Sequence, residues 1–454
     1  MRRSGRLGRT AATARLGTTL GAGTLRREVA RRLAPAERRA EVARAHELRT
    51  AEQVARTLGE MKGALMKLGQ LASFIDEGLP EPYRQALATL QADAPPMAAE
   101  LAAQVVEAEL GRQPEDAFAE FDPVPLAAAS IGQVHRATTV DGRAVAVKVQ
   151  YPGVDEAIRA DLSNTAVLAR LLPALFPSLD GRVLATELRD RLLEELDYRR
   201  EAANQRRFAD AYRGHPFIHV PDVVDELSTA RVLTTELAEG ARFDEVVTWP
   251  REERDLAGET LFRFVFRGIN RLGIFNGDPH PGNYLFRSGG RVTFLDFGLV
   301  RAFAPEETRV FNQMIQTLVL DGDGDAYRRV LEDVGLLRGG AGLSTDQVVE
   351  YFGHFYALVR EPGPFTVGSD YASETVRRIF DRASPVAAAV DLPPMFVIVQ
   401  RINLGLYALL ARLEATADWR RIAEELWPMT DGPPATALGR LEAEWARRRL
   451  ADRG

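Results

Sequence analysis

Two short segments constrain the fold of this chain more than any other feature. FNGDPHPGNYLF occupies residues 275–286, and FLDFG occupies residues 294–298. The first segment is too rich in proline and glycine to form a helix, so the side chains of Asp278 and Asn283, five residues apart, can point into one cleft. The apolar residues of VTFL bury the next strand and leave Asp296 at its end. We therefore expect three oxygen-bearing side chains to converge beside short strands.

The spacing of these side chains indicates a particular chemistry. An aspartate, an asparagine five residues later and an Asp-Phe-Gly after a short hairpin form the geometry that a phosphoryl-transfer site requires. In this interpretation Asp278 accepts or orients the proton of the acceptor, while Asn283 and Asp296 supply oxygen ligands to Mg²⁺. The alternative is a structural loop in which the aspartates cap turns and the asparagine satisfies backbone groups. For His280, a hydrogen bond that stiffens the loop is favoured over catalysis.

A site of this kind also needs a lysine on an upstream strand, and VAVKV at residues 145–149 offers one. Strand alternation places the three valines on the core face and Ala146 with Lys148 on the other face. A small residue could then line an adenine pocket beside an ammonium group that binds phosphate. The alternative is an edge-strand lysine that is simply solvated.

The glycine-rich phosphate loop expected before such a strand is missing, and AAASIGQVHRA at residues 127–137 stands in its place. Its three alanines and Gly132 are small enough for a close approach of the backbone. Only Gly132 has the freedom to adopt a positive φ. The sequence therefore predicts a stiffer and differently shaped phosphate cradle.

Composition limits the remaining possibilities. The chain has 454 residues, of which 46% are hydrophobic and 27% charged, so it can bury a large core. It contains no cysteine, which excludes disulfides and cysteine metal sites, so any metal must be held by oxygen atoms or by the six histidines. No run of 18 uncharged apolar residues occurs, so we expect no membrane-spanning helix and a cytoplasmic location.

Charge is distributed unevenly along the chain. Residues 1–50 hold thirteen arginines and four glutamates, a net charge of +9, so the other 404 residues carry −15 of the total of −6. This basic segment is expected to be partly mobile and able to contact an anionic membrane surface at the inner face of the membrane. Nucleic acid is not expected as a partner. Helical periodicity follows at residues 51–74, and one long charged helix is predicted at residues 184–208.

Six motifs then occur in the order found in the UbiB-like (AarF-domain) atypical protein kinases, which the chain resembles over about residues 55–415. The motifs are MKLGQ (66–70), AAASIGQVH (127–135), VAVKVQYPG (145–153), EELDYRREAAN (194–204), GDPHPGN (277–283) and LDFG (295–298). The resemblance implies an α+β, two-lobed protein-kinase-like fold with an N-terminal helical extension packed over the nucleotide cleft. It also implies ATP or ADP with Mg²⁺ as cofactors, and a link to isoprenoid-quinone or other lipid metabolism, with proteins of such a pathway as partners.

The resemblance assigns roles to individual residues. Asp278 and Lys148 are carried over as catalytic, with Glu201 as the acid that pairs with Lys148, although Glu195 stays open as the partner. Backbone groups between Glu236 and Ala238 would form the hinge that binds adenine. The residues expected to contact nucleotide are Ala127, Ala128, Ala129, Ser130, Gly132, Val134, Ala146, Lys148, Glu236 and Ala238.

A regulatory set is implied as well. Lys67 and Gln70 lie on one face of their predicted helix, which in the family covers the nucleotide cleft, and Glu195 and Asp197 resemble the acidic pair that faces it. The alternative for these charges is an ordinary solvated helix face.

The domains expected are a basic segment (1–50), a helical extension (51–120), an N-lobe (121–240) and a mostly helical C-lobe (241–454). Two other functions stay open beside the UbiB-type kinase or ATPase. One is a small-molecule kinase similar to the aminoglycoside phosphotransferases, which share a loop of this type. The other is a nucleotide-gated scaffold with weak hydrolysis.

Three further features are interpreted as structural. Gly277 stands where ordinary protein kinases carry an arginine, so the usual clamp for a phosphorylated activation loop is absent. Ala304-Pro305-Glu306 is typical of a helix start rather than of the end of an activation segment. DGDGD at residues 321–325 lacks the twelve-residue calcium-loop pattern and predicts a turn.

Overall fold

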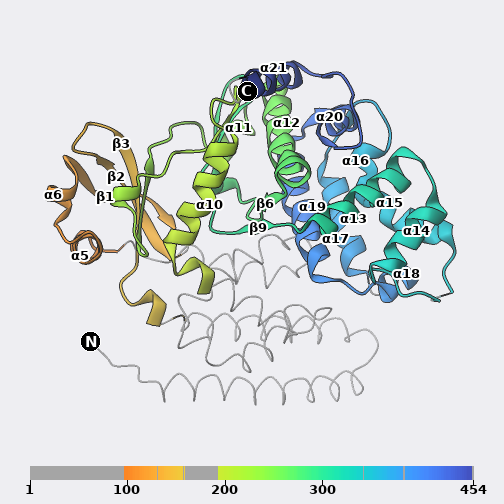
Figure 1. The fold of residues 1–454 in the computed structure, drawn as a ribbon, viewed down its shortest axis with the longest axis horizontal. Coiled ribbons are helices and arrows are strands. Elements are labelled where there is room, and N and C mark those ends of the chain that lie inside the picture. Colours follow the sequence, from red (N-terminus) through yellow and green to blue (C-terminus); the bar gives the residue numbers. More distant parts are fainter. Residues whose placement is uncertain are drawn as a thin grey trace, which may run out of the picture. The chain divides into compact units, whose positions relative to one another are not determined.

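The computed structural model comprises two compact units (Figure 1). The first is formed by residues 1–142, 147–198 and 229–233, and the second by residues 143–146, 199–228 and 234–454. The structure describes the chain at residues 97–129, 131–156, 158, 193–340, 342–381 and 384–451. The basic segment, the helix expected at residues 51–74 with Lys67 and Gln70, and Ser130 lie outside these residues.

The first unit is built around a four-stranded sheet. Its strands, in the order β1-β2-β3-β5, are β1 (Glu120–Ala129), β2 (Gly132–Thr138), β3 (Ala144–Gln150) and β5 (Val232–Glu236), preceded by helices α5 (Ala99–Leu110) and α6 (Pro114–Ala117). β1 and β2 form an antiparallel hairpin. Val145, Val147 and Val149 of β3 are completely buried, so the alternation predicted for this strand is confirmed.

The second unit is mostly helical, as the sequence predicts for the chain from about residue 260 onward. Its helices are α10 (Tyr198–Ala211), α11 (Phe243–Val246), α12 (Arg251–Arg267), α13 (Pro305–Ile315), α14 (Gly324–Asp333), α15 (Thr345–Gly353), α16 (Ala357–Arg360), α17 (Ser369–Phe380), α18 (Pro385–Ala389), α19 (Pro394–Leu413), α20 (Trp419–Leu426) and α21 (Ala437–Ala451). Its 3₁₀ turns are η2 (Asp225–Leu227), η4 (Pro281–Asn283) and η6 (His354–Tyr356), and its π turns are η3 (Gly268–Leu272) and η5 (Gln316–Leu320).

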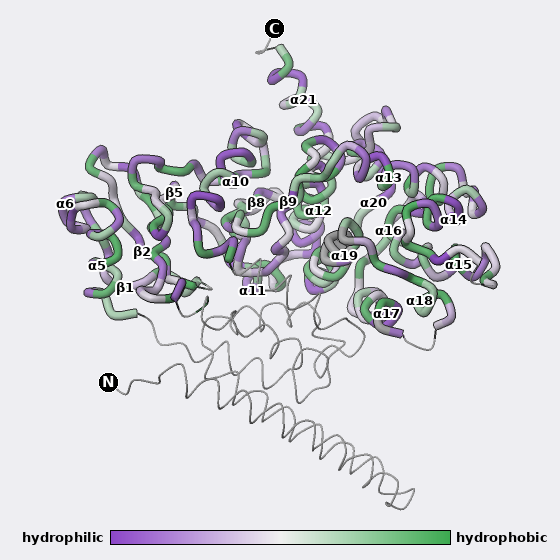
Figure 2. The backbone as a smooth tube through the Cα atoms, turned by 60° about the horizontal axis from the view of Figure 1, so that its bottom comes forward, coloured by the Kyte–Doolittle hydropathy of each residue, from purple (hydrophilic) through white to green (hydrophobic). Residues whose placement is uncertain are grey.

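The strands of this unit are short. They are β4 (Ile218–His219), β6 (Ile274–Asn276), β7 (Tyr284–Arg287), β8 (Arg291–Phe294), β9 (Val300–Ala302), β10 (Phe365–Thr366) and β11 (Thr416–Ala417). β8 lies between β4 and β7, β6 pairs with β9, and β10 pairs with β11. Hydrophobic and hydrophilic residues alternate along the helices of this unit (Figure 2), as expected of helices with one buried side.

Helix α12 lies at the centre of the second unit, in contact with α19, α20 and β8. A Cβ atom at Gly258 would lie 2.5 Å from the Cβ of Ala415, so only glycine allows α12 this close approach. On the sheet side, the rings of Phe264 and Phe294 stack with centroids 3.6 Å apart. Tight packing on both sides fixes α12, and with it the turn that leads into β6.

Two helix starts agree with the sequence. Pro305 is the first residue of α13, and the Glu307 carboxylate accepts a hydrogen bond from the backbone nitrogen of Ala304 (2.9 Å). Asp323 caps α14 by accepting a hydrogen bond from the backbone nitrogen of Ala326 (2.8 Å). The interpretation of both segments as structural is confirmed.

The long charged helix predicted at residues 184–208 is interrupted. The described helical residues 193–195 end before Asp197, and α10 begins only at Tyr198. The backbone nitrogen of Tyr198 instead donates to the carbonyl of Ala230 (2.9 Å). This tertiary hydrogen bond competes with the helical one, and no residue pattern in EELDYRRE reveals it.

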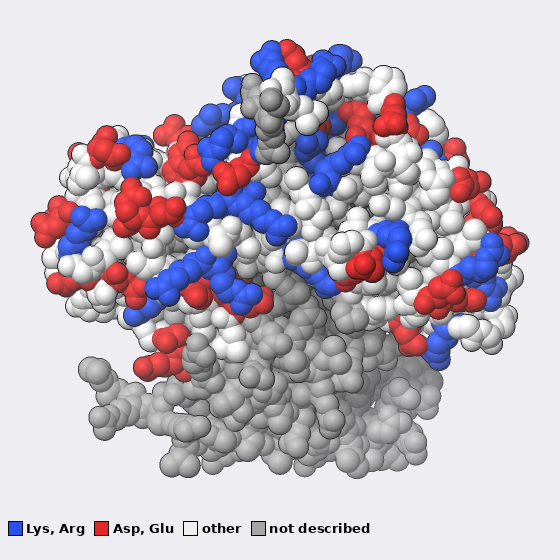
Figure 3. Space-filling view, in the orientation of Figure 1, with Lys and Arg blue, Asp and Glu red and all other residues white. Residues whose placement is uncertain are grey.

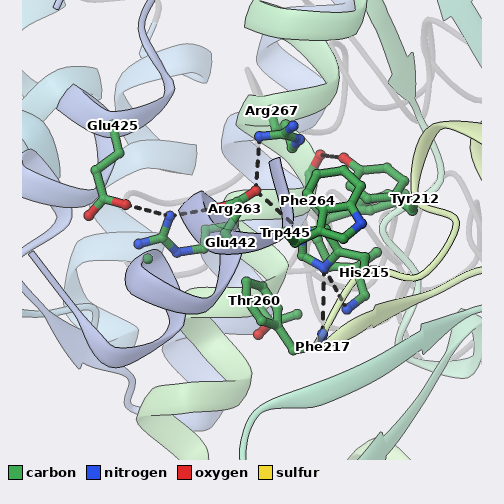
Figure 4. Close-up of polar contacts among 12 residues, drawn as sticks. Tyr212, His215, Phe217, Thr260, Arg263, Phe264, Arg267, Glu425, Glu442 and Trp445 are labelled. Atoms are coloured by element: carbon green, nitrogen blue, oxygen red, sulfur yellow. Dashed lines mark hydrogen bonds and ion pairs between the residues drawn. The ribbon is translucent and has the colours of Figure 1, made fainter. Parts of the chain in front are cut away.

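A buried charge cluster joins α12 to α20 and α21 (Figure 4). Arg263 has no exposed side-chain surface and forms ion pairs with Glu259 (2.7 Å), Glu425 (2.9 Å) and Glu442 (2.8 Å). Arg267 also pairs with Glu442 (3.0 Å). Every charge of the cluster has an oppositely charged partner, and Arg263 and Glu442 have several, which burial of charged groups requires. The cluster therefore holds α21 against the centre of the unit.

His215 completes this cluster as a neutral side chain. Its Nδ1 accepts a hydrogen bond from the backbone nitrogen of Ile218 (3.1 Å), so the ring proton resides on Nε2, which faces Glu442 (3.5 Å). Burial lowers the pKa of His215, although Glu442 partly opposes this. Burial would raise the pKa of Glu442, but the hydrogen bond with His215 and the charges of Arg267 and Arg263 outweigh it and lower that pKa to about 2.

Charges of both signs are mixed on the visible face of the second unit (Figure 3). On the face shown in Figure 3, Lys and Arg side chains are interspersed with Asp and Glu over its outer helices. Within the described ranges, no helix is both long and apolar enough to cross a membrane.

We predict that Glu442→Gln lowers the free energy of unfolding at pH 7 by about 3 kcal/mol, because Arg263 and Arg267 lose a buried counter-charge. The control is Glu444→Gln on the same helix, whose partner Arg448 is three-quarters exposed, and which should change stability by less than about 0.5 kcal/mol. Urea denaturation measures both. Equal stability of the two variants would contradict the role given to the cluster.

The same cluster predicts a pH dependence. Because the pKa of Glu442 is depressed in the folded state, its contribution is fully present above about pH 4.5 and is lost as pH falls toward 2. Over this window the wild-type chain should lose more stability than Glu442→Gln. Parallel curves of stability against pH for the two proteins would count against the assignment.

Candidate active site

A loop between two strand pairs forms the candidate site of the second unit. Residues 277–283 connect β6 to β7, and residues 295–299 connect β8 to β9. The backbone nitrogen of Gly277 donates to the carbonyl of Leu299 (2.7 Å), and that of Leu295 donates to the carbonyl of Asn283 (3.0 Å). The two connections therefore run side by side, which brings Asp296 next to the loop that carries Asp278 and Asn283.

Internal hydrogen bonds hold the loop in one shape. Asn283 Nδ2 and the backbone nitrogen of His280 both donate to the carbonyl of Asp278, at 3.0 and 2.8 Å. His280 Nδ1 accepts from the backbone nitrogen of Gly282 (3.1 Å). The loop-stiffening hydrogen bond predicted for His280 is therefore present. Because the Asn283 amide nitrogen faces Asp278, its oxygen faces the other way.

Hydrogen bonds hold Asp296 through both its side chain and its backbone. Its carboxylate accepts a hydrogen bond from the backbone nitrogen of Gly298 (2.9 Å), and its carbonyl accepts one from Asn276 Nδ2 (2.7 Å). Burial, with the charges of Asp278 and Asp296 nearby, raises the pKa of Tyr284 well above its usual range. Both carboxylates therefore lie around the same buried ring, at the start of β7.

Helix α10 places Glu201 beside this group. Glu201 is only 6% exposed. A Cβ atom at Gly298 would lie 3.2 Å from Asp296 Oδ1 and 3.8 Å from Glu201 Oε2, so the glycine occupies the space between the two carboxylates. Asn204 Nδ2, one turn further along α10, donates to the carbonyl of Phe297 (3.0 Å). These contacts fix α10 to the residues that follow Asp296.

The donor set fits Mg²⁺ with a phosphate ligand. No group of three or more His, Asp or Glu side chains that could hold a metal by itself is found among the described residues. Asn283 and Asp296 offer one amide oxygen and one carboxylate. Mg²⁺ is usually held by one or two carboxylates together with substrate phosphates and water, so these residues suit a metal that arrives with a nucleotide.

In the first unit, the alanine segment is the end of a strand. Ala127, Ala128 and Ala129 belong to β1 and lie opposite Val134, Gln133 and Gly132 of β2. Backbone pairing holds them extended up to the hairpin turn. The alanines are therefore part of a paired strand and not of a free loop, and the stiffer phosphate cradle stays a prediction.

Gly132 is needed for space and not for a positive φ. Its φ is not positive. A Cβ atom at this position would lie 2.2 Å from the carbonyl oxygen of Val149, so glycine is needed because β2 passes directly over the backbone of β3. The close approach of the backbone for which Gly132 is small enough is therefore present, and its freedom to adopt a positive φ is not used.

Three further residues predicted to contact nucleotide lie on strands β2 and β3 of the sheet. Lys148 and Ala146 are half-buried, on the face of β3 opposite the valines, and the ammonium of Lys148 lies 5.1 Å from the ring centroid of Tyr198. Val134 is half-buried between the buried Gln133 and His135, which places it on the other face of β2.

The acidic residues predicted to regulate the site or to form the hinge lie in two other segments. Glu195 and Asp197 are half-buried in the turn before α10. Glu236 ends β5, and its hydrogen bond with His219 (3.3 Å) lowers its pKa. Ala238 is half-buried two residues later.

Comparison with known proteins identifies the family. Residues 89–331 match the model of the ABC1 atypical kinase-like domain, which is more than half of the chain. The chain belongs to the ABC1 atypical kinase-like family. The resemblance stated from the six motifs is confirmed.

Relatives of this ABC1 protein are found in eukaryotes and bacteria. The chain is 36% identical over 334 residues to the mitochondrial atypical kinase COQ8B of Rattus norvegicus, covering 72% of this chain and 62% of that protein. It is 34% identical over 291 residues to the chloroplastic ACTIVITY OF BC1 COMPLEX KINASE 8 of Arabidopsis thaliana, covering 58% of this chain and 38% of that protein. The chain thus spans less than two thirds of the length of these relatives.

A solved structure covers more of the ABC1 chain. It is the complex of Rv3197 with erythromycin from Mycobacterium tuberculosis, which is 35% identical, covers 86% of this chain and 98% of its own, and superposes with a TM-score of 0.63. The predicted α+β, two-lobed kinase-like fold is confirmed.

Sequence reasoning missed three positioning residues of this ABC1 site. Asn276, Asn204 and Gly298 hold Asp296 and the residues after it. All three lie within or beside the motifs FNGDPHPGN, EELDYRREAAN and LDFG. Their place in the motifs was a signal, but the backbone groups that they bind come from distant parts of the sequence.

We predict that Gly132→Ala lowers the free energy of unfolding by about 3 kcal/mol, because its Cβ would overlap the backbone of β3. The control is Gly142→Ala, where φ is +85° and no atom lies within 4 Å, so that only about 1 kcal/mol of backbone strain is expected. Thermal unfolding compares the two variants. A larger loss at Gly142 would show that conformation, and not space, determines the need for glycine.

Proposed function

We propose that this ABC1 protein binds ATP or ADP with Mg²⁺ and catalyses phosphoryl chemistry, as a kinase or an ATPase. The observation that carries the proposal is the pairing of residues 277–283 with residues 295–299, which gathers Asp278, Asn283 and Asp296 around Tyr284. A phosphoryl-transfer site needs a group that orients the acceptor and oxygen ligands for a metal. Few structural loops require both.

In this proposal the residues of the loop and its neighbours have separate roles. Asp278 accepts or orients the proton of the acceptor hydroxyl or water. The Asn283 amide oxygen and the Asp296 carboxylate would hold Mg²⁺, which neutralises charge on the phosphates. Asn276 and Gly298 keep Asp296 in place through its carbonyl and its carboxylate.

Lys148 would bind phosphate from β3, with Ala146 beside it against adenine. The nucleotide would also contact the hairpin at Ala127, Ala128, Ala129, Ser130, Gly132 and Val134, and the segment from Glu236 to Ala238. For the acid that pairs with Lys148 we favour Glu201 over Glu195, because Glu201 is buried and lies next to Gly298. Lys67 and Gln70, with Glu195 and Asp197, would regulate access to the cleft.

The biological setting belongs to the same proposal. Relatives are named as mitochondrial or chloroplastic atypical kinases, and the family resemblance links them to isoprenoid-quinone or other lipid metabolism. We propose a peripheral association with an anionic membrane and with proteins of such a pathway. ATP consumption with and without anionic liposomes and isoprenoid-like phenols separates this role from that of a soluble small-molecule kinase, which needs neither, and from that of a scaffold with weak hydrolysis.

Asp296→Asn should weaken binding of Mg²⁺-ATP at least tenfold, while binding of metal-free ATP changes little, because the variant loses one anionic metal ligand. Calorimetric titration with and without Mg²⁺ measures the difference. Asp333→Asn, which changes an exposed aspartate at the end of α14, serves as the control. If Asp296→Asn and the control bind Mg²⁺-ATP equally well, the metal assignment is wrong.

The basic segment generates a separate prediction. Since residues 1–50 carry +9 and the remainder is acidic, only this end can lead the protein to an anionic surface, at about 1 kcal/mol for each arginine that engages. The full chain should sediment with phosphatidylglycerol liposomes at low salt, and a chain starting at Ala51 should sediment less. Equal sedimentation of both chains, or binding that does not fall with salt, would refute a membrane-targeting role.

A further inference from the structure

The second unit contains a cavity away from the residues described above. It measures about 150 Å³, is partly open, and is lined by α12, η3, α13, α14, α15, η6, α16, α19 and α20. Protein interiors are close-packed, so the residues that line a space of this size forfeit dispersion contacts toward it. A cavity of about 150 Å³ accommodates a single aromatic ring.

The lining restricts what can enter. The described residues around the cavity are aromatic and aliphatic, with Asn270 and Gln400 as the amides and none of them charged. An ionised ligand would lose its hydration there without a counter-charge. The occupant must therefore be neutral and largely apolar.

One polar atom of the lining lacks a partner. Asn270 Nδ2 is buried and forms no hydrogen bond among the described residues. The Tyr327 hydroxyl is buried too, but the Tyr356 hydroxyl lies within hydrogen-bonding reach of it, so Tyr327 is not available to a ligand. The Asn270 amide can donate to a ligand, and leaving it unpaired is costly.

The backbone around Asn270 is unusual. η3 is a π turn of five residues, Gly268–Leu272, inserted between α12 and β6. Such turns are frequent at functional sites, because they change the direction of the side chains that follow. Asn270 lies on this turn, eight residues before Asp278.

The opposite wall of the cavity also touches the loop at residues 277–283. α19 contributes Phe396, Gln400 and Tyr407 to the lining. On the same helix, a Cβ atom at Gly405 would lie 2.1 Å from Cγ of Pro279. The backbone of α19 therefore rests directly on the residue after Asp278. Both η3 and α19 connect the cavity to that loop.

We propose that this cavity binds a neutral, single-ring molecule with a hydrogen-bond acceptor, which takes a hydrogen bond from Asn270, and that its binding changes the state of the loop at residues 277–283. The first clause is independent of the proposed function. The second clause rests on it.

Binding is tested with the full chain and three probes, by calorimetry or ligand-observed NMR. Acetophenone carries a ring and an acceptor, ethylbenzene has a similar shape without the acceptor, and benzoate is charged. Acetophenone should bind about fivefold more tightly than ethylbenzene, the difference that one hydrogen bond makes, and benzoate should not bind. Absence of binding by acetophenone would overturn the proposal, as would equal binding of benzoate.

Variants locate the site. Asn270→Leu keeps the shape of the side chain and should remove the preference for acetophenone over ethylbenzene. Ala423→Phe fills the cavity from α20 and should abolish binding of both. Asn312→Leu, which removes another amide with an unpaired atom in the same unit, is the control and should bind like wild type. Thermal unfolding verifies that each variant folds. If Ala423→Phe does not fold, Asn270→Leu alone tests whether the probe binds in this cavity.

If both variants bind acetophenone as the wild type does, the molecule binds elsewhere and the proposal is wrong. The second clause predicts that acetophenone changes the affinity for Mg²⁺-ATP at least twofold in the wild type and not in Ala423→Phe. Binding of acetophenone with an unchanged affinity for Mg²⁺-ATP would overturn this coupling. A protein that binds acetophenone but no nucleotide would instead overturn the proposed function.

Discussion

The second unit depends on backbone hydrogen bonds that bind one loop to another. Gly277 donates to Leu299 at one end of the loop, and Leu295 donates to Asn283 at the other. These bonds use main-chain groups, and the side chains add bonds of their own. Asn283 Nδ2 donates to the carbonyl of Asp278, and the Asp296 carboxylate accepts from the backbone nitrogen of Gly298. The backbone pairing therefore sets the course of the two connections, and the side-chain bonds fix the positions of Asn283 and Asp296 within them.

Acidic side chains have different surroundings in the cluster around Arg263 and in the candidate site. In the cluster around Arg263, each buried carboxylate is satisfied by arginine or histidine, and the result is structural. Around Tyr284, burial raises the pKa of the hydroxyl, and the charges of Asp278 and Asp296 nearby raise it further. Carboxylates gathered in this way favour a cation. Two carboxylates near one buried hydroxyl, in place of a cluster of ion pairs around an arginine, distinguish the candidate site from the core.

Helix α10 and helix α19 reach the site from opposite directions in the sequence. α10 holds the residues after Asp296 through Asn204 and through the contact of Phe208 with Phe297, whose ring centroids are 4.9 Å apart. α19 rests on Pro279. The loop at residues 277–283 is thus supported by elements that enclose other parts of the unit, including the apolar cavity. Such packing gives a physical route by which occupancy of the cavity could reach the candidate site.

Local patterns determined much of this protein. Alternation in VAVKV predicted the buried valines of β3, and proline with following glutamates predicted the start of α13. Spacing alone predicted that Asp278, Asn283 and Asp296 act together, because loop and strand lengths limit where these side chains can lie. The six motifs in order indicated the family, which the match to residues 89–331 then established.

The tertiary structure determined those features that depend on backbone groups distant in the sequence. The interruption before α10 follows from a hydrogen bond between Tyr198 and Ala230, and the need for glycine at 132 follows from the carbonyl of Val149. Asn276 and Asn204 acquire their roles from carbonyl groups about 20 and 93 residues away. The cavity is lined by nine separate helical elements and by residues that connect them, and no single element forms it alone. A sequence specifies its local conformation residue by residue, whereas close approaches and enclosed space arise only when several elements pack together.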